Sequence, residues 1–171
     1  MNPPPRGYRY IGPPELRSTV RPDTAGRIIR SAEDLAAWLS GRGTAESAEP
    51  FTFVVALDGF LRLAPRRSEH VACAGGGDVL AAGELGFHRD YGSWMVREVS
   101  NQSTGYCPDR DSWHAVARAL DLAGIGHPGR FTHEVVFRRC ERCRECSVVR
   151  EGDFVRVFCG IGLPWAWNVA P

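Results

Sequence analysis

Residues 51–63 read Phe-Thr-Phe-Val-Val-Ala-Leu-Asp-Gly-Phe-Leu-Arg-Leu. Apolar residues fill both ends of this stretch, and the pair Asp58-Gly59 lies between them. Two such runs joined by an aspartate-glycine pair are typical of a β-hairpin. We therefore predict strands at 51–57 and 60–63, joined by a type I′ turn in which Asp58 and Gly59 take positive φ angles.

Further strands are predicted after this hairpin, because short apolar runs alternate there with polar and glycine-rich turns. They cover residues 71–74, 79–87, 94–100 and 131–137, and the polar stretch 88–93 is predicted to be a loop between two of them.

Two helices are predicted from periodicity and capping signals. The shorter one begins at Ser31, whose side chain can cap the helix while Asp34 reaches back in a capping box. The longer one follows Pro108-Asp109 and ends at Gly124, and its apolar stripe has helical spacing; the stripe consists of Trp113, Val116, Ala117 and Leu120. The fold class predicted is α+β, mainly an antiparallel sheet with one long packed helix.

The chain divides into four predicted segments. Half of the 12 prolines fall within residues 1–30, which we interpret as an extended arm that contains neither a helix nor a central strand. Residues 31–50 are predicted to hold the first helix and a linker, and residues 51–139 the α+β domain. Residues 140–171 are predicted to form a zinc-ribbon-like β-hairpin with a tryptophan-rich tail.

The composition excludes several classes of function. The formal net charge is +1, so the chain as a whole has no field to attract nucleic acid or an anionic membrane. All 21 basic residues are arginine, which excludes mechanisms that need a lysine amine. Neither a signal-peptide core nor a membrane-spanning apolar stretch is found, and we expect a cytoplasmic protein.

Four of the six cysteines lie close together near the C-terminus, which in a reducing compartment indicates a metal site. They are Cys140, Cys143, Cys146 and Cys159. Residues 140–163 resemble a zinc ribbon, in which two C-x-x-C turns supply four thiolates to a structural zinc ion. Arg156 stands where the ribbon pattern has a cysteine, so Cys146 or, as a weaker candidate, His133 would be the fourth ligand. The alternative is a ribbon that has lost its metal.

The same segment offers two further surfaces. Six arginines could meet phosphates or an acidic protein, although four acidic residues dilute them; they are Arg138, Arg139, Arg142, Arg144, Arg150 and Arg156. Trp165 and Trp167 could stack on bases or close the ribbon onto the main domain. Nucleic-acid binding is thus possible but not favoured.

The stretch from His70 to Glu84 contains a glycine turn followed by Val-Leu-Ala-Ala-Gly-Glu, and a polar turn comes after the next predicted strand. Both motifs resemble a domain of uncharacterised bacterial proteins and of plant calmodulin-binding proteins with an IQ motif. The resemblance covers residues 50–125 and implies a fold, not a reaction. The histidine of the family's second motif is absent here, because residues 103–106 read Ser-Thr-Gly-Tyr.

The polar turn could bind an anion through its amides and hydroxyls, and its candidate ligand-binding residues are Asn101, Ser103, Thr104 and Tyr106. As an enzyme, the chain could use Cys107 as a nucleophile with His70 as its base and Asn101 as an orienting amide. Alternatively, Glu84 and His70 could act as acid and base. Each of these residues has an ordinary structural interpretation as well, in helix capping or a buried pair.

The function predicted is a binding or adaptor module with a structural zinc ribbon, which recognises a protein or a small ligand. The alternative is a transferase or hydrolase with a pocket formed by His70, Glu84 and the turn 101–106.

Overall fold

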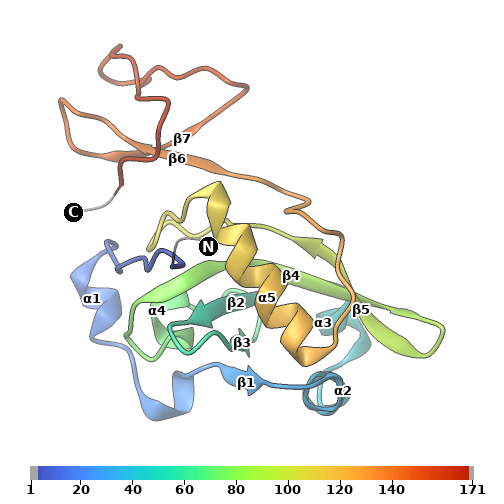
Figure 1. Ribbon diagram of the computed structural model, residues 1–171. Helices are drawn as coiled ribbons and strands as arrows, with labels where there is room; N and C mark the ends of the chain where they lie inside the picture. Colours follow the sequence, from blue (N-terminus) through green and yellow to red (C-terminus); the bar gives the residue numbers. More distant parts are fainter. Residues whose placement is uncertain (1–3, 170–171) are drawn as a thin grey trace.

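The computed structural model describes residues 4–169 and confirms the predicted α+β class. A five-stranded sheet has the order β1-β3-β2-β4-β5, and every neighbouring pair is antiparallel. Helix α5 lies across one face of this sheet (Figure 1). The strands are β1 (Arg27–Ile29), β2 (Phe51–Ala56), β3 (Leu61–Ala64), β4 (Val79–Asp90) and β5 (Ser93–Val99).

The helix limits agree with the capping signals. The Asp34 amide donates to the Ser31 Oγ at 3.1 Å, and Gly124 ends α5 in the left-handed conformation, with φ 69°. The Asp34 carboxylate, however, accepts from the amide of Arg30 at 2.8 Å, one residue before the position that a capping box requires. The helices are α1 (Pro14–Arg17), α2 (Ala32–Ser40), α3 (Thr44–Ser47), α4 (His70–Cys73) and α5 (Trp113–Ala123), with 3-10 turns η1 (Pro22–Thr24) and η2 (Arg110–Ser112).

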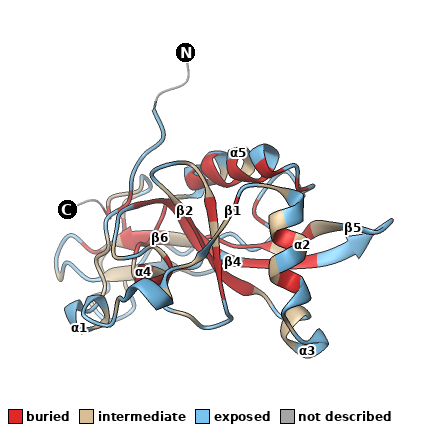
Figure 2. Ribbon diagram, turned by 90° about the horizontal axis from the view of Figure 1, so that it is seen from below, coloured by how far each residue is buried: buried red, intermediate tan, exposed pale blue. Residues whose placement is uncertain are grey.

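Both faces of the sheet are covered. Phe51 and Phe53 belong to a core shared with α2 and α5, whereas Val54, on the opposite face, packs in a second core with Tyr8 and Tyr106. Buried residues run through β2, most of β4 and one side of α5, while the tip of the β4–β5 hairpin is exposed (Figure 2). Because β2 is buried on both faces, its sequence is a continuous apolar run instead of an alternating one.

The turn type of the first hairpin was predicted wrongly. Strands β2 and β3 pair as expected, but Gly59 alone has a positive φ, 84°. Asp58 instead accepts a hydrogen bond from the amide of Phe60 at 3.0 Å, a side-chain cap that a type I′ turn does not need. Two consecutive positive φ angles occur at Tyr91 and Gly92, within the stretch predicted to be a loop, and there β4 and β5 continue almost to the turn.

Other local predictions are corrected by the structure. Residues 71–74, predicted as a strand, are largely helical. The prediction was wrong because a short buried apolar run fits a strand or a helical turn equally well. The predicted strand 131–137 forms only from residue 136. The segment 1–30, predicted to contain no helix, contains α1. This helix begins at Pro14, and at the first position of a helix the missing amide hydrogen of proline costs no hydrogen bond. The predicted linker contains α3.

The C-terminal segment, residues 136–169, starts with the predicted hairpin. Strand β6 (Val136–Arg139) pairs with β7 (Cys146–Val149), and this hairpin and the chain that follows lie to one side of the sheet (Figure 1). The tail returns to the main body at Trp167, whose indole N–H donates to the Cys107 carbonyl at 2.9 Å. The C-terminal segment is therefore fastened to the turn that precedes α5.

Candidate metal centre and neighbouring cavity

Three cysteines of the C-terminal segment converge. The sulfur atoms of Cys140, Cys143 and Cys159 all lie within 4.8 Å of one another, close enough to hold a metal ion. A tight turn after Cys140 and another that ends at Gly160 bring them together: the Arg144 amide donates to the Cys140 carbonyl at 2.9 Å, and the Gly160 amide donates to the Arg156 carbonyl at 2.7 Å. Three convergent thiols are a donor set suited to zinc and other soft ions.

The surroundings of the cluster favour the thiolate form of one member. The backbone amide of Glu145 and the guanidinium of Arg156 lower the pKa of Cys143 to about 7. Cys140 is buried, whereas Cys143 and Cys159 are half-buried. Because the thiolate is the form that binds metal, Cys143 is the member best suited to take up an ion near neutral pH, whereas the contact with Cys143 raises the pKa of Cys159.

Arg156 lies beside the cluster, where the zinc-ribbon pattern has a cysteine. Its guanidinium hydrogen-bonds to Cys143 and donates to the Ser147 Oγ at 2.7 Å. Its Nε is buried and, among the described residues, has no hydrogen-bond partner. Three thiolates and a divalent cation sum to one negative charge, which the guanidinium would balance. The sequence shows the missing cysteine but not that the arginine turns toward the thiols.

Cys146, predicted as a ligand, lies outside the cluster. It belongs to β7, and its side chain packs in the apolar cluster that contains Cys107. His133, the weaker candidate, is also elsewhere, with its Nδ1 at 2.9 Å from the Oγ1 of Thr132. The structure thus brings together three of the four predicted ligands and supplies no fourth thiol.

The polar turn of the central motif is mainly occupied by internal contacts. Asn101 is fully buried; its amide group donates to the carbonyls of Val135 and Pro108, and its oxygen accepts from the Val135 amide at 2.7 Å. Tyr106 is also buried and donates to the Gly77 carbonyl at 2.6 Å. Ser103 is buried, and its hydroxyl has no hydrogen-bond partner among residues 4–169; of these four side chains, only Thr104 is exposed. These side chains hold three segments of chain together.

The candidate catalytic residues are placed differently. The Nε2 of His70 lies 2.9 Å from the Gly83 carbonyl, and burial lowers its pKa although Glu84 acts in the opposite direction. Glu84 itself is exposed. Cys107 is buried, and the neighbouring Cys146 thiol, with a further contribution from burial, raises its pKa. A thiol in this state is a poor nucleophile at neutral pH.

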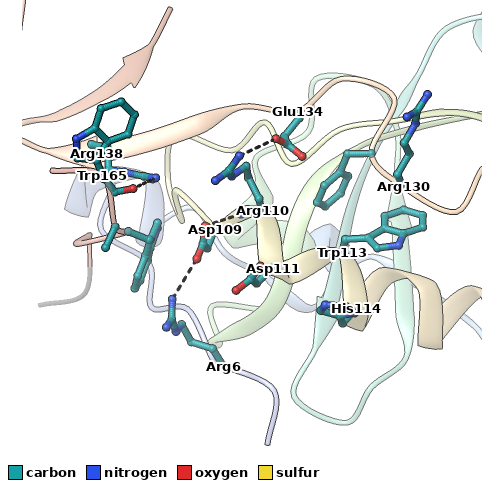
Figure 3. Close-up of a pocket in the computed structure, with 13 residues that line it drawn as sticks. Arg6, Asp109, Arg110, Asp111, Trp113, His114, Arg130, Glu134, Arg138 and Trp165 are labelled. Carbon is teal, nitrogen blue, oxygen red and sulfur yellow. Dashed lines mark hydrogen bonds and ion pairs between the residues drawn. The ribbon is translucent and has the colours of Figure 1, made fainter. Parts of the chain in front are cut away.

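A cavity of about 550 Å³ lies between the start of α5 and the tail of the C-terminal segment (Figure 3). Its lining includes two ion pairs, Arg6 with Asp109 and Arg110 with Glu134, each with 3.4 Å between a guanidinium nitrogen and a carboxylate oxygen. Arg138 forms part of one wall, and its guanidinium group donates hydrogen bonds to three backbone carbonyls. Within residues 4–169, three charged or polar lining side chains make no hydrogen bond or ion pair: Asp111, His114 and Arg130.

A second, open cavity of about 940 Å³ lies between the N-terminal segment and α2. Its lining includes four arginines and three acidic residues, so its charge is nearly balanced. Neither cavity is lined by His70, Glu84 or the turn 101–106.

Comparison with family models, with curated proteins and with solved structures found no match for this chain. The two resemblances stated above therefore stay predictions. Among the helices of residues 4–169, none combines the length and the apolar character needed to cross a bilayer.

Proposed function

We propose that this protein is a protein-binding module whose C-terminal segment is held in shape by a zinc ion on Cys140, Cys143 and Cys159. The observation that carries the proposal is the position of the thiol cluster directly beside an exposed apolar tip. Val157 and Phe158, the two residues before Cys159, are 88% and 85% exposed.

Exposed apolar side chains are concentrated in this segment. Five of the eight large exposed hydrophobic residues of the described chain belong to it; they are Val148, Val155, Val157, Phe158 and Trp165. An aromatic residue on a rigid tip is a typical anchor for a pocket on a partner protein. Since an exposed apolar surface is costly in water, its concentration here supports docking over a passive role.

Zinc would supply the rigidity. The loop from residue 150 to 160 forms no helix or strand in the described structure, and its backbone is held by isolated bridges, Arg150 with Asp153 and Val155 with Gly162, and by a few turn hydrogen bonds. A metal bond between its end and the β6–β7 turn replaces the core that such a short loop cannot build. The ion would have a structural role, and Arg156 would offset the charge of the zinc-thiolate group.

Metal analysis of the purified, zinc-reconstituted protein tests the metal centre. We expect one zinc ion per chain, lost in Cys159→Ser and retained in Cys146→Ser, the matched control. Retention in Cys159→Ser, or loss in Cys146→Ser, would show that the ligands are different ones.

The docking surface is tested with Phe158→Ser and with Leu122→Ser, a control that removes an exposed apolar residue of α5, 61% exposed, away from the tip. A protein captured by the wild-type chain should bind it as a purified pair, with a Kd weakened at least roughly tenfold by Phe158→Ser and by zinc removal. Equal binding by wild type and Phe158→Ser would refute the docking role.

Two alternatives have less support. Three of the six arginines of the C-terminal segment are occupied, since Arg138 is buried, Arg139 contacts the tail and Arg156 faces the thiols. An active site at the turn 101–106 would need side chains that already serve internal bonds. We therefore place nucleic-acid binding and catalysis behind the binding module.

A further inference from the structure

Two thiols outside the metal cluster lie in contact across the junction between the main body and the C-terminal segment. Cys107 follows the polar turn of the main body, and Cys146 belongs to β7. Their side chains pack into one small apolar cluster with Phe137 and Val169, where each thiol shifts the pKa of the other, and the Cys107 thiol donates to the Thr104 carbonyl at 3.4 Å. Residues 39 positions apart are thus brought to a place where their sulfur atoms can meet.

We propose that Cys107 and Cys146 form a reversible disulfide, which covalently fastens the C-terminal segment to the turn before α5. The junction holds a second fastening at the same residue, because Trp167 donates to the Cys107 carbonyl at 2.9 Å. The bond would therefore fix a contact that is already made, without moving either segment far. It does not depend on the proposed docking function.

The two cysteines have different access to solvent, which sets the order of the reaction. Cys107 is 2% exposed, whereas Cys146 is half-buried and reachable. The neighbouring Cys107 thiol lowers the pKa of Cys146 to about 7, and Arg139 acts in the same direction. Thiols with a pKa near the ambient pH are effective attackers of disulfides.

The oxidant is a low-molecular-weight disulfide. The thiolate of Cys146 attacks one of its sulfur atoms, forms a mixed disulfide and releases one small thiolate. The sulfur of Cys107, having given up its proton, then attacks Cys146 and releases the second thiolate, which takes up a proton. Two protein thiols are oxidised to one disulfide, and one small disulfide is reduced to two thiols.

The test uses the full-length, zinc-loaded chain with oxidised glutathione. In the wild-type protein, we expect a mass loss of two hydrogens and one cross-linked peptide pair containing Cys107 and Cys146. The thermal midpoint should rise by about 5–10 °C, because the bond closes a loop of some 40 residues in the unfolded chain. Cys73→Ser is the matched control, since Cys73 at the end of α4 is buried and its thiol donates to the Arg62 carbonyl; it should behave as wild type.

Two variants report the order of attack. Cys107→Ser should stop at the mixed disulfide and retain one glutathione on Cys146, whereas Cys146→Ser should leave Cys107 unmodified. A wild-type protein that accumulates the mixed disulfide without the cross-link would overturn the proposal, as would an equal rate of modification at Cys107 in the Cys146→Ser variant.

Discussion

Gly83 lies where two backbone segments of the main body cross. A Cβ atom at this position of β4 would overlap the carbonyl group of Ser100 and come within 3.1 Å of the Cα of Asn101. The carbonyl oxygen of Gly83 lies 2.9 Å from the Nε2 of His70. The absence of a side chain at Gly83 therefore allows the polar turn after β5 to lie on β4.

Replacing Gly83 by alanine should destabilise the fold by about 2–3 kcal/mol, because the obstacle is backbone, which cannot rotate away as a side chain can. Urea unfolding measures the change. Gly43→Ala is the control: a Cβ there meets nothing within 4 Å, and its cost should stay below about 1 kcal/mol. Equal losses of unfolding free energy in Gly83→Ala and Gly43→Ala would show that the backbone of Ser100 does not obstruct a side chain at residue 83.

Arg156 is the residue at which the thiol cluster departs from four cysteines. Arg156→Cys should supply the fourth thiolate and raise the zinc affinity by roughly tenfold or more, since a closed tetrahedral sulfur site binds zinc more tightly than three thiolates. Competition with a chromophoric chelator measures the affinity. Arg156→Ser removes the cation without adding a ligand and should show no such gain.

At the scale of elements, the β2–β3 hairpin is stabilised by its own ion pair. Asp58 receives two hydrogen bonds from the Arg62 guanidinium, at 2.8 and 2.9 Å. This contact, with a smaller contribution from the amide of Phe60, lowers the pKa of Asp58 from 3.8 to about 2. The turn is thus held by a carboxylate where the sequence predicted a turn held by backbone angles.

Protonation of Asp58 should weaken the hairpin. Because its pKa is lower in the folded protein than in the unfolded chain, its contribution is complete above pH 3.8 and is lost as the pH falls through about 2. Asp58 is 43% exposed, so solvent screening limits the effect to about 1 kcal/mol or less. Asp58→Asn should lack this pH-dependent loss in acid unfolding curves, and a variant that retains it would refute the assignment.

Elements defined by strong local signals were predicted well from sequence. The cap at Ser31 is confirmed, and so are Val116 and Leu120 of the predicted α5 stripe, with Trp113 partly buried against the core. Ala117 is only half-buried, and Ala115 and Ala119 are buried on that face instead. Residues 71–74 failed because four apolar residues fit a strand or a helical turn, and packing against the sheet decides between them.

For the candidate site, spacing predicted three of the thiols but not the fourth position. The turn after Cys140 and the turn from Arg156 to Gly160 are both local. The C-x-x-C spacing carries the information for Cys140 and Cys143 only, because Arg156 takes the place of the first cysteine in the second turn. The place of Cys146 depends on which face of β7 meets the main body, and this is a tertiary property. Asn101 was likewise interpreted as a ligand residue, because a sequence does not show that Val135 and Pro108 lie beside it.

At the scale of the whole molecule, Trp167 joins both ends of the described chain to the main body. Its ring meets Tyr8 edge to face at 5.3 Å between centroids and lies 4.7 Å from the Arg6 guanidinium carbon. Its N–H reaches the Cys107 carbonyl. One side chain therefore connects the N-terminal segment, the polar turn and the tail.

Trp167→Ala should cost about 3 kcal/mol and increase protease cleavage near Tyr8, because the ring covers that segment. Thermal unfolding and limited proteolysis measure the two effects. Trp165→Ala is the control, since that ring is 78% exposed and should cost less than about 1 kcal/mol. Unchanged cleavage near Tyr8 in Trp167→Ala would contradict the connecting role.

The contact between Tyr8 and Trp167 can form only late in translation. The ribosome makes Tyr8 early and Trp167 only after every strand of the main sheet has been synthesised. While the tail is still inside the exit tunnel, the face of the sheet beside Tyr8 lacks its indole cover. The nascent protein must pass through a stage in which the sheet can form but the N-terminal segment is only partly anchored.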